Sequence, residues 1–185
     1  AHVICLNAGV SAPGPMAELK LIDWEWVLGV NLWGIIHGID AFLDRMMTED
    51  EGHFVVTASV MGHTCYPTSG PYTATKHAAV SIAETLYNEL SAAGSQVGVT
   101  ALCPGLVNTQ IVDSIRNRPE HLWDRAAALP SDEDQRVRDA ILEEFAAIAL
   151  EPSKVADLVH SAILDGTFWV FTDNRHDESI NRRHA

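Results

Sequence analysis

Tyr72 and Lys76 are the residues whose types and spacing most clearly suggest chemistry. They are four residues apart, so on a helix both side chains project from one face. A free phenol has a pKa of about 10 and is a poor base at neutral pH, but a fixed ammonium nearby stabilises the phenolate and lowers that pKa. The chain has only three lysines and three tyrosines, which makes a chance pairing uncommon. The spacing therefore predicts a general acid/base.

Ser59 directly follows an apolar run, where a substrate would lie if the run is a strand. Its hydroxyl could hydrogen-bond a carbonyl or alcohol oxygen. It could equally be a turn serine that satisfies backbone groups. A third interpretation, a serine hydrolase, is weak because the surrounding residues lack the glycines of a G-x-S-x-G nucleophile elbow.

Asn31 lies inside a stretch with a helical pattern, where asparagine is a poor helix former that competes for backbone hydrogen bonds. It is either a tolerated polar residue on an apolar helix or, close to a catalytic site, a residue that holds a water or opens the helix locally.

The elements that must position these residues alternate along the chain. Short apolar runs predict strands at 2–6, 53–58, 97–102 and 167–172, and helical patterns cover 23–47, 72–93 and 152–164, with Asp23 as the expected N-cap of the first. This alternation predicts an α/β fold with a doubly wound parallel sheet. Ligands bind at the carboxyl ends of such strands, so the residues that follow each strand are expected to form the site.

Composition narrows the class of protein. The 185 residues are 47% hydrophobic and 20% charged, as in a packed single domain, and the net charge of −13 disfavours nucleic acid and anionic lipid as partners. No apolar run approaches the roughly 18 residues of a membrane helix. Three scattered cysteines and nine histidines form no disulfide framework and no metal-ligand spacing, which favours a reducing cytoplasm and no metal.

Several short motifs follow one another in a diagnostic order. Asn7-Ala8-Gly9 follows the first strand, Asn31 lies in the next helix, Ser59 follows the second strand, Tyr72-x-x-x-Lys76 opens the second long helix, and Pro104-Gly105-Leu106-Val107-Asn108-Thr109 follows the third strand. In this order and on these elements, the chain resembles the short-chain dehydrogenase/reductase family over nearly its whole length.

The resemblance implies a Rossmann-like oxidoreductase that transfers a hydride between NAD or NADP and a secondary alcohol or ketone. Tyr72 would be the acid/base, Lys76 would lower its pKa and bind the nicotinamide ribose, Ser59 would orient the substrate oxygen, and Asn31 would support a water. The implied cofactor-binding residues are Asn7, Ala8, Gly9, Tyr72, Lys76, Pro104, Gly105, Val107 and Thr109. Dimers or tetramers are the assemblies that the family implies.

The substrate is expected to be a small, lipophilic molecule. Ser59, Met61, Tyr66 and Leu106 would contact it, and a lid at about 106–150, around Trp123, would cover it. Since pockets in general are mostly apolar, the lipophilic character is a hypothesis.

One family feature is absent from the chain. The glycine-rich turn T-G-x-x-x-G-x-G, which holds the cofactor pyrophosphate, does not occur, and the strand at 3–6 resembles the family's fourth. Residues 1–185 are therefore expected to be the C-terminal part of one NAD(P)-binding domain, with an apolar strand unpaired at one edge. A catalytically idle Rossmann-like binding or assembly module is the alternative function. The residue that selects NAD or NADP follows the family's second strand and is not in the chain.

Overall fold

The fold is built on one parallel sheet. The computed structural model describes residues 1–123, 136, 143 and 147–184. Strands β1 (Val3–Leu6), β2 (His53–Thr57), β3 (Gly98–Cys103) and β4 (Trp169–Phe171) lie in the order β1-β2-β3-β4, and every neighbouring pair is parallel. The strand bounds differ from the expected ranges by at most two residues at either end. The predicted doubly wound α/β architecture is confirmed.

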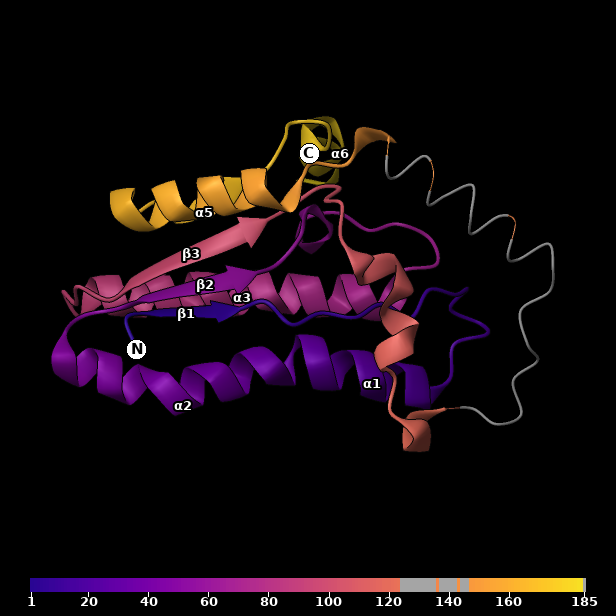
Figure 1. The fold of residues 1–185 in the computed structure, drawn as a ribbon, viewed down its shortest axis with the longest axis horizontal. Coiled ribbons are helices and arrows are strands. Elements are labelled where there is room, and N and C mark those ends of the chain that lie inside the picture. Colours follow the sequence, from indigo (N-terminus) through magenta and orange to yellow (C-terminus); the bar gives the residue numbers. More distant parts are fainter. Residues whose placement is uncertain (124–135, 137–142, 144–146, 185) are drawn as a thin grey trace.

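Helices cover both faces of the sheet (Figure 1). Helices α2 (Trp33–Glu49) and α3 (Gly70–Ala92) pack on one face, where Phe54, Val56 and Val99 are buried. Helix α5 (Pro152–Asp165) packs on the other face against Val55 and Leu102. The remaining described elements are α1 (Leu21–Asn31), the short 3-10 helices η1 (Val60–Gly62), η2 (Gln110–Asn117) and η3 (Glu120–Leu122), and α6 (Asp177–His184).

The expected helix at 23–47 is two helices, α1 and α2, separated at Leu32. Asp23 is not the N-cap; Lys20 is, and its backbone N–H donates to Asp23 Oδ2 at 2.8 Å. A carboxylate in the first turn fulfils the same electrostatic role from a position inside the helix. The break falls next to Asn31, where the sequence suggested a local opening.

Leu21–Glu49 is also the one described stretch long and apolar enough to cross a membrane by length and composition. The expectation that no run would approach this length was therefore wrong. In the structure the stretch is divided at Leu32, and Trp26, Val27, Ile35 and Met46 are buried against the rest of the chain. A core helix of a soluble protein meets the same criterion, so the stretch carries no membrane assignment.

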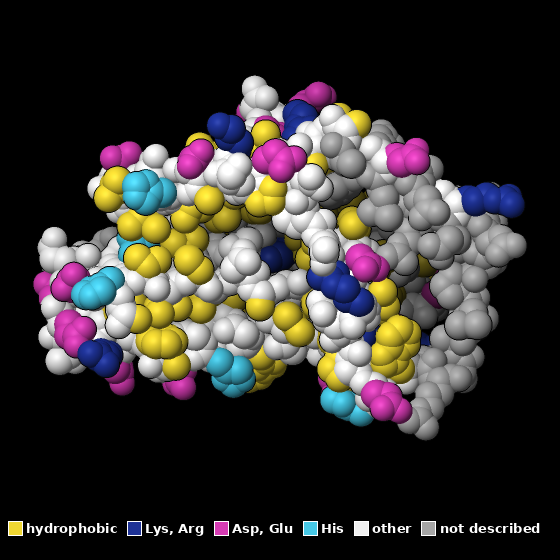
Figure 2. All heavy atoms as spheres, in the orientation of Figure 1, with side chains coloured by type: hydrophobic (Ala, Val, Ile, Leu, Met, Phe, Trp, Pro, Cys, Tyr) yellow, Lys and Arg dark blue, Asp and Glu magenta, His cyan; other side chains and the backbone are white. Residues whose placement is uncertain are grey.

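Strand β1 lies at the edge of the sheet. It pairs with β2 on one side and, within the part of the chain that the structure describes, with no strand on the other. Val3 and Cys5 are exposed on it. Hydrophobic side chains gather on the face between α5 and α2 (Figure 2). The expected apolar edge strand is thus observed.

The two ends of the segment at 106–150 lie side by side. Leu150 N–H donates to Leu106 O at 2.9 Å and Asn108 N–H donates to Leu150 O at 2.8 Å, so the two ends of the segment are held together. Its first part, which we call the strap (Thr109–Trp123), contains η2 and η3. The sequence Ser131-Asp132-Glu133-Asp134, whose acidic residues predict the start of a helix, lies outside the described residues. The polar residues after β4, which predict a frayed tail by their composition, form α6 instead.

Candidate active site

Helix α3 places Tyr72 and Lys76 at the carboxyl edge of β2. The helix begins at Gly70 with Pro71 in its first turn, where a missing N–H costs nothing. Lys76 Nζ lies 5.5 Å from the centroid of the Tyr72 ring, so the two side chains share one face as predicted.

The Lys76 ammonium is buried, with 3% of the residue exposed. It donates a hydrogen bond of 2.7 Å to Thr57 O, the last carbonyl of β2. Burial lowers the pKa of Lys76 to about 8. An ammonium has three donors, and the described residues supply one acceptor, so Lys76 keeps donors available for a ligand.

The neighbouring Cys103 thiol is also buried, and burial raises its pKa to about 12. It is therefore neutral near pH 7, so the charge at this point of the site belongs to Lys76. All three cysteines are free thiols. Among the described residues no group of three or more His, Cys, Asp or Glu could hold a metal ion.

Burial raises the pKa of the Tyr72 phenol, and a hydrogen bond with the Ser59 side chain opposes that rise. The expectation that Lys76 lowers this pKa below its usual value was wrong for these residues. Desolvation of the phenolate is the largest effect, and Lys76, whose pKa is lowered to about 8, loses its own charge before a phenol with a raised pKa ionises. At neutral pH Tyr72 is therefore a protonated phenol, ready to donate a proton.

Ser59 is buried at the N-terminus of η1. Its Oγ accepts from Met61 N–H at 3.1 Å and donates to Pro104 O at 3.4 Å. Ser59 therefore satisfies backbone groups, as the turn interpretation expects, and its side chain also hydrogen-bonds the Tyr72 side chain. None of these described contacts is a histidine or a carboxylate, so the structure gives no support to a serine nucleophile.

Asn31 is 1% exposed, and both the oxygen and the nitrogen of its side-chain amide form hydrogen bonds. Oδ1 accepts from Val10 N–H at 2.8 Å, and Nδ2 donates to Val10 O at 3.0 Å and to Thr75 Oγ1 at 3.1 Å. Thr75 in turn donates to Tyr72 O at 2.7 Å. Asn31 therefore ties the loop after β1 to the helix that carries Tyr72. Thr75 was missed, because the two threonines between Tyr72 and Lys76, Thr73 and Thr75, cannot be told apart by type or spacing.

Gly9 belongs to the same cluster. A Cβ on Gly9 would lie 3.7 Å from Lys76 Nζ and 3.8 Å from Asn31 Oδ1, so its backbone lines the ammonium. Asn7 and Ala8 are exposed beside it, and Asn7 Oδ1 accepts from Thr57 Oγ1 at 2.9 Å. The structure brings these three predicted cofactor residues to the edge where Lys76 lies.

The predicted cofactor residues after β3 divide into two groups. Pro104 O accepts from Val60 N–H at 3.0 Å as well as from Ser59, which places it in the site. Val107 instead packs against the core under α5, and Thr109 caps η2 by accepting from Ile111 N–H. Their predicted contacts with a cofactor remain predictions.

Gly105 marks a contact that sequence reasoning missed. Its N–H donates to Thr172 Oγ1 at 2.9 Å, and a Cβ on it would lie 2.5 Å from Asp173 Oδ2, so a larger residue would have to displace the Asp173 carboxylate. Arg175 holds the pKa of the Asp173 carboxyl below its usual value through hydrogen bonds and charge. The segment after β4 thus packs directly against Gly105.

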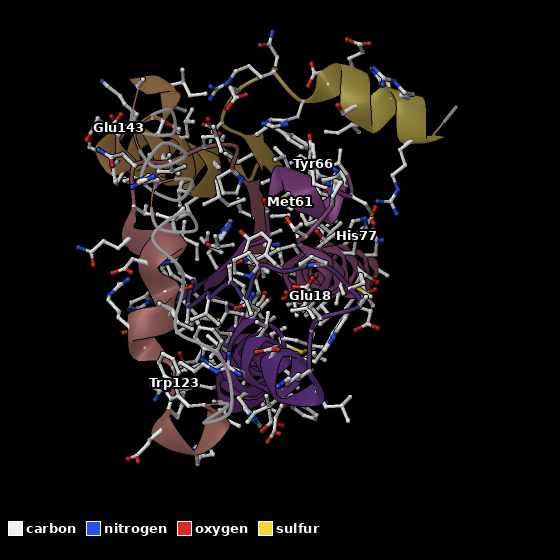
Figure 3. The ribbon with its side chains drawn as sticks, turned by 90° about the vertical axis from the view of Figure 1, so that its right-hand side faces the viewer. Glu18, Met61, Tyr66, His77, Trp123 and Glu143 are labelled. Atoms are coloured by element: carbon white, nitrogen blue, oxygen red, sulfur yellow. The ribbon has the colours of Figure 1, made fainter. Side chains whose placement is uncertain are left out.

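The predicted substrate residues lie beside η1. Met61 and Leu106 are half-buried and Tyr66 is exposed, with its hydroxyl 3.2 Å from His176 Nδ1. Figure 3 shows Met61 and Tyr66 close together. Trp123, the last residue of the strap, lies far from both. Trp123, expected to help line the pocket, therefore does not join Met61 and Tyr66.

A family comparison agrees with this geometry. The model of the family described as short chain dehydrogenase matches residues 2–120. The chain belongs to the short-chain dehydrogenase family.

Relatives with known structures include cofactor complexes. A short-chain dehydrogenase/reductase from Burkholderia phymatum in complex with NAD is 38% identical, with a TM-score of 0.90 over 99% of this chain and 65% of that one. A protein from Beutenbergia cavernae described as an NAD(P)-dependent gluconate 5-dehydrogenase, with bound NADP, is 27% identical, with a TM-score of 0.68 over 93% of this chain and 64% of that one. Members similar to this chain therefore bind NAD or NADP.

Curated relatives include an uncharacterised oxidoreductase of Staphylococcus saprophyticus, which is 32% identical over 161 residues. That alignment covers 87% of this chain and 58% of the relative. The chain thus spans about half of the length of the curated relatives that it matches.

The site fits the nicotinamide half of such a cofactor. Lys76 has donors left for ribose hydroxyls, and the exposed backbone at Ala8 and the small surface of Gly9 leave room beside the ammonium. The turn that would hold a pyrophosphate is not part of this sequence. These are the features that the predicted contacts with the nicotinamide end of a cofactor require.

Proposed function

We propose that the whole protein containing this chain is an NAD(P)-dependent oxidoreductase that interconverts a secondary alcohol and a ketone, with Tyr72 as the acid/base. The observation that carries the proposal is the shared placement of Tyr72, Ser59 and Lys76 at the carboxyl edge of β2. The bound nicotinamide would supply or accept the hydride.

Tyr72 supplies the proton in the direction of reduction. Its phenol is protonated at neutral pH because burial raises its pKa, and its hydroxyl already shares a hydrogen bond with Ser59. A carbonyl oxygen placed between the two hydroxyls receives the Tyr72 proton as negative charge develops on it, while Ser59 orients that oxygen. In oxidation the proton returns to Tyr72.

Lys76 and Asn31 hold this arrangement in place. Lys76 offers its remaining donors to a ribose hydroxyl while Thr57 O fixes its position. Asn31, through Thr75, holds the backbone of Tyr72 against the loop after β1. The resemblance also assigned a water to Asn31; its side-chain amide is engaged by protein atoms here.

The proposed substrate is a small, lipophilic ketone or secondary alcohol. Met61 and Leu106 offer apolar surface beside Ser59, and no described charged side chain bonds to Ser59 or Tyr72. Tyr66 with His176 places one polar contact at the rim. This supports a substrate with an apolar body and few polar groups.

We also propose that the protein is a homo-oligomer of the cytoplasm. Leu21, Trp33, Phe42 and Met47 are exposed on α1 and α2, and such an apolar helical surface suits a self-complementary contact. The free thiols are in keeping with a reducing compartment.

Tyr72→Phe tests the proposed reaction. In the whole protein we expect NAD(P)H-dependent reduction of aliphatic and aryl ketones, followed by cofactor absorbance, to fall by about 10³-fold, because general acid catalysis contributes about 10²- to 10⁴-fold. Cofactor affinity, measured by fluorescence titration, is expected to change less than twofold, since the phenyl ring stays beside Lys76.

Tyr87→Phe is the matched control, because Tyr87 lies on the same helix with its ring stacked on Phe168. It should leave turnover unchanged. Undiminished turnover in Tyr72→Phe would overturn the role of Tyr72. Cofactor binding without turnover of any ketone or alcohol by the unmodified protein would favour the idle binding module instead.

A further inference from the structure

A cavity of about 360 Å³ lies between η1, α3, β4 and α6. Its wall includes, from α3, β4 and α6, the residues His77, Val80, Ser81, Glu84, Trp169 and Arg183. Ser59, Tyr72 and Lys76 are not among the described residues that line it. The cavity is therefore separate from the candidate active site, although α3 contributes to both.

Helix α3 supplies one face of this cavity. His77, Val80, Ser81 and Glu84 stand at positions i, i+3, i+4 and i+7, so they share one side of the helix. Since a helix rises 1.5 Å per residue, the backbone positions of His77 and Glu84 are about 10 Å apart along its axis. This face therefore has an imidazole at one end, a carboxylate at the other, and a hydroxyl and an apolar side chain between them.

Arg183 lies at the His77 end of the cavity. Its Nη1 donates to His77 Nε2 and, at 3.0 Å, to Cys65 Sγ. Because His77 Nδ1 lies 2.9 Å from Thr73 O, which can only accept, Nδ1 carries the hydrogen and Nε2 offers its lone pair to Arg183. The imidazole is therefore uncharged in this arrangement, and the positive charge at this end belongs to Arg183. Figure 3 shows His77 on the side of α3 that lies toward α6, the helix that carries Arg183.

The charge of Arg183 is not neutralised by a described carboxylate. Among the described residues no Asp or Glu oxygen lies within ion-pairing distance of it, and only Nη1 of its guanidinium forms hydrogen bonds with them. Its neighbour Arg182, by contrast, pairs with Glu178 at 2.7 Å. Arg183 thus keeps charge and donors at the cavity for an anion. A carboxylate matches the planar guanidinium best, because it can accept two parallel hydrogen bonds.

The cavity also has an apolar wall. Trp169 is 37% exposed on the edge strand β4, and the His63 ring holds it in an edge contact with centroids 5.3 Å apart. Val80 adds aliphatic surface from α3. An aromatic ring of a ligand can stack on the indole, and a cavity of this volume has room for one such ring.

Glu84 limits the charge of the ligand. It is exposed and lies two helical turns from His77, at the other end of the face that α3 supplies. A ligand with one negative group can place it on Arg183, away from Glu84. A second negative group across the ring would approach the Glu84 carboxylate and be repelled. The wall therefore favours a monoanion over a dianion.

We propose that this cavity is a binding site for a small aromatic monocarboxylate. The carboxylate of the ligand accepts from Arg183 and from the Ser81 hydroxyl, and the ring lies against Trp169 and Val80. Glu84 disfavours a second carboxylate on the ring. The site goes beyond the proposed oxidoreductase function and does not depend on it, because none of these residues takes part in the proposed reaction.

Calorimetric titration of the whole protein with benzoate tests the proposal. We expect saturable binding, and Arg183→Gln should weaken it by about 10- to 100-fold, since hydrogen bonds between charged groups are lost. Ser81→Ala should weaken it by about threefold, since one hydroxyl donor is lost. Acetate, which has no ring to cover Trp169, should bind about tenfold more weakly than benzoate.

Arg182→Gln is the matched control. It removes a guanidinium from the same helix, but one that is paired with Glu178 and does not belong to the described cavity wall. Benzoate affinity should stay unchanged in this variant. Both arginines are exposed, so neither variant should shift the midpoint of urea unfolding. Equal weakening in the two variants, or no saturable binding of benzoate by the unmodified protein, would overturn the proposal.

Terephthalate tests the limit on charge, because it carries a second carboxylate across the ring. It should bind about threefold more weakly than benzoate, and Glu84→Gln should remove this difference. Glu89→Gln, at an exposed position on α3 outside the described cavity wall, should preserve it. Equal affinities for the two acids in the unmodified protein would contradict the role of Glu84.

Tyr72→Phe separates this site from the active site. Tyr72 does not line the cavity, so the variant should bind benzoate as the unmodified protein does, even where turnover of ketones is lost. Benzoate whose affinity changes in Tyr72→Phe and not in Arg183→Gln would lie in the active site, which would refute the proposal. Absence of ketone turnover in the unmodified protein would instead count against the proposed function and leave this binding site unaffected.

Discussion

A buried titratable side chain lies at each end of strand β2, and the two differ in how many of their hydrogen-bonding groups are already satisfied. At the amino end, His53 Nε2 lies 2.8 Å from Thr100 Oγ1, and Thr100 donates to Thr167 O at 2.8 Å. Because the Thr100 hydroxyl gives its one proton to that carbonyl, it must accept from His53, so Nε2 carries the hydrogen. At the carboxyl end, Lys76 donates to Thr57 O and has further donors to give.

The space around His53 and around Lys76 differs in the same way. A Cβ on Gly98 would lie 2.3 Å from the His53 ring, so a glycine leaves just enough room for the imidazole. Lys76 lies instead beside Gly9, where a Cβ would meet it at an ordinary contact distance of 3.7 Å. The amino end is closed and serves the fold. The carboxyl end keeps donors and space, which is the form that a ligand site takes.

Among the variants at the two ends of β2, Lys76→Met should have the largest effect on turnover. We expect turnover in the whole protein to fall by about 10²- to 10³-fold, because the variant removes a buried charged donor aimed at the site. The pKa of Lys76 is about 8, so its ammonium loses its proton as pH rises through that value. In the unmodified protein, cofactor affinity should therefore fall between pH 7 and pH 9.

The measurement is fluorescence titration of the reduced cofactor across that pH range. In Lys76→Met the affinity should be weak and nearly independent of pH. Lys154→Met, at an exposed position on α5, should reproduce the pH dependence of the unmodified protein. The same decline in Lys76→Met would show that another group titrates.

Matched threonine variants compare the two ends directly. Thr75 and Thr100 are both fully buried, and each passes a hydrogen bond from a polar side chain to a backbone carbonyl. Replacing either with valine should lower the free energy of unfolding by about 1–3 kcal/mol, since a buried partner is left unsatisfied. Thr75→Val should also reduce kcat by about tenfold, because a shift of one functional group by about 1 Å can cost up to 10²-fold.

Thr100→Val should leave kcat unchanged at a temperature where the protein stays folded. Urea unfolding and steady-state kinetics on the same preparations measure both quantities. If both variants lose turnover in proportion to stability, Asn31 and Thr75 act on the fold in general and not on Tyr72.

Much of this molecule could be predicted from local signals. Alternating apolar runs and helical periodicity predicted the strands, α3 and α5. Residues that are buried against a parallel sheet form local hydrophobic patterns, which can be recognised in a short stretch of sequence. Tyr72 and Lys76 were identified from their four-residue spacing and the small number of tyrosines and lysines, and Ser59 from its position directly after a strand. A local opening at Asn31 was only one of two interpretations of the sequence, and the sequence could not decide between them, because Asn31 makes its contacts with residues 21 and 44 positions away.

The rest depends on long-range packing. The pKa of Tyr72 could not be predicted, since spacing shows that Lys76 is near but not how deeply both are buried. The pairing of Ser114 with Ser11 joins residues 103 positions apart, and Asp173 reaches Gly105 from the segment after β4. Such contacts carry no periodic signal in one sequence.

His53→Gln should give the smallest effect, one that appears only at acidic pH. Burial lowers the pKa of His53 below its ordinary value of 6.5. As pH falls through about 6.5, the unfolded chain takes up a proton at this position that the folded chain does not bind, so the folded state loses stability. The contribution of His53 is therefore intact above pH 6.5 and is lost progressively below it, towards the lowered pKa.

Urea unfolding at pH 7.5, 6.5 and 5.5 measures this dependence. Because glutamine can donate to Thr100 but does not titrate, His53→Gln should lose less stability between pH 6.5 and 5.5 than the unmodified protein does. His160→Gln, at an exposed position on α5, should keep the full dependence. An identical acid dependence in all three proteins would mean that the imidazole at the amino end of β2 is protonated as readily when folded as when unfolded. The closed character assigned to that end would then be wrong, and with it the contrast between the two ends of the strand.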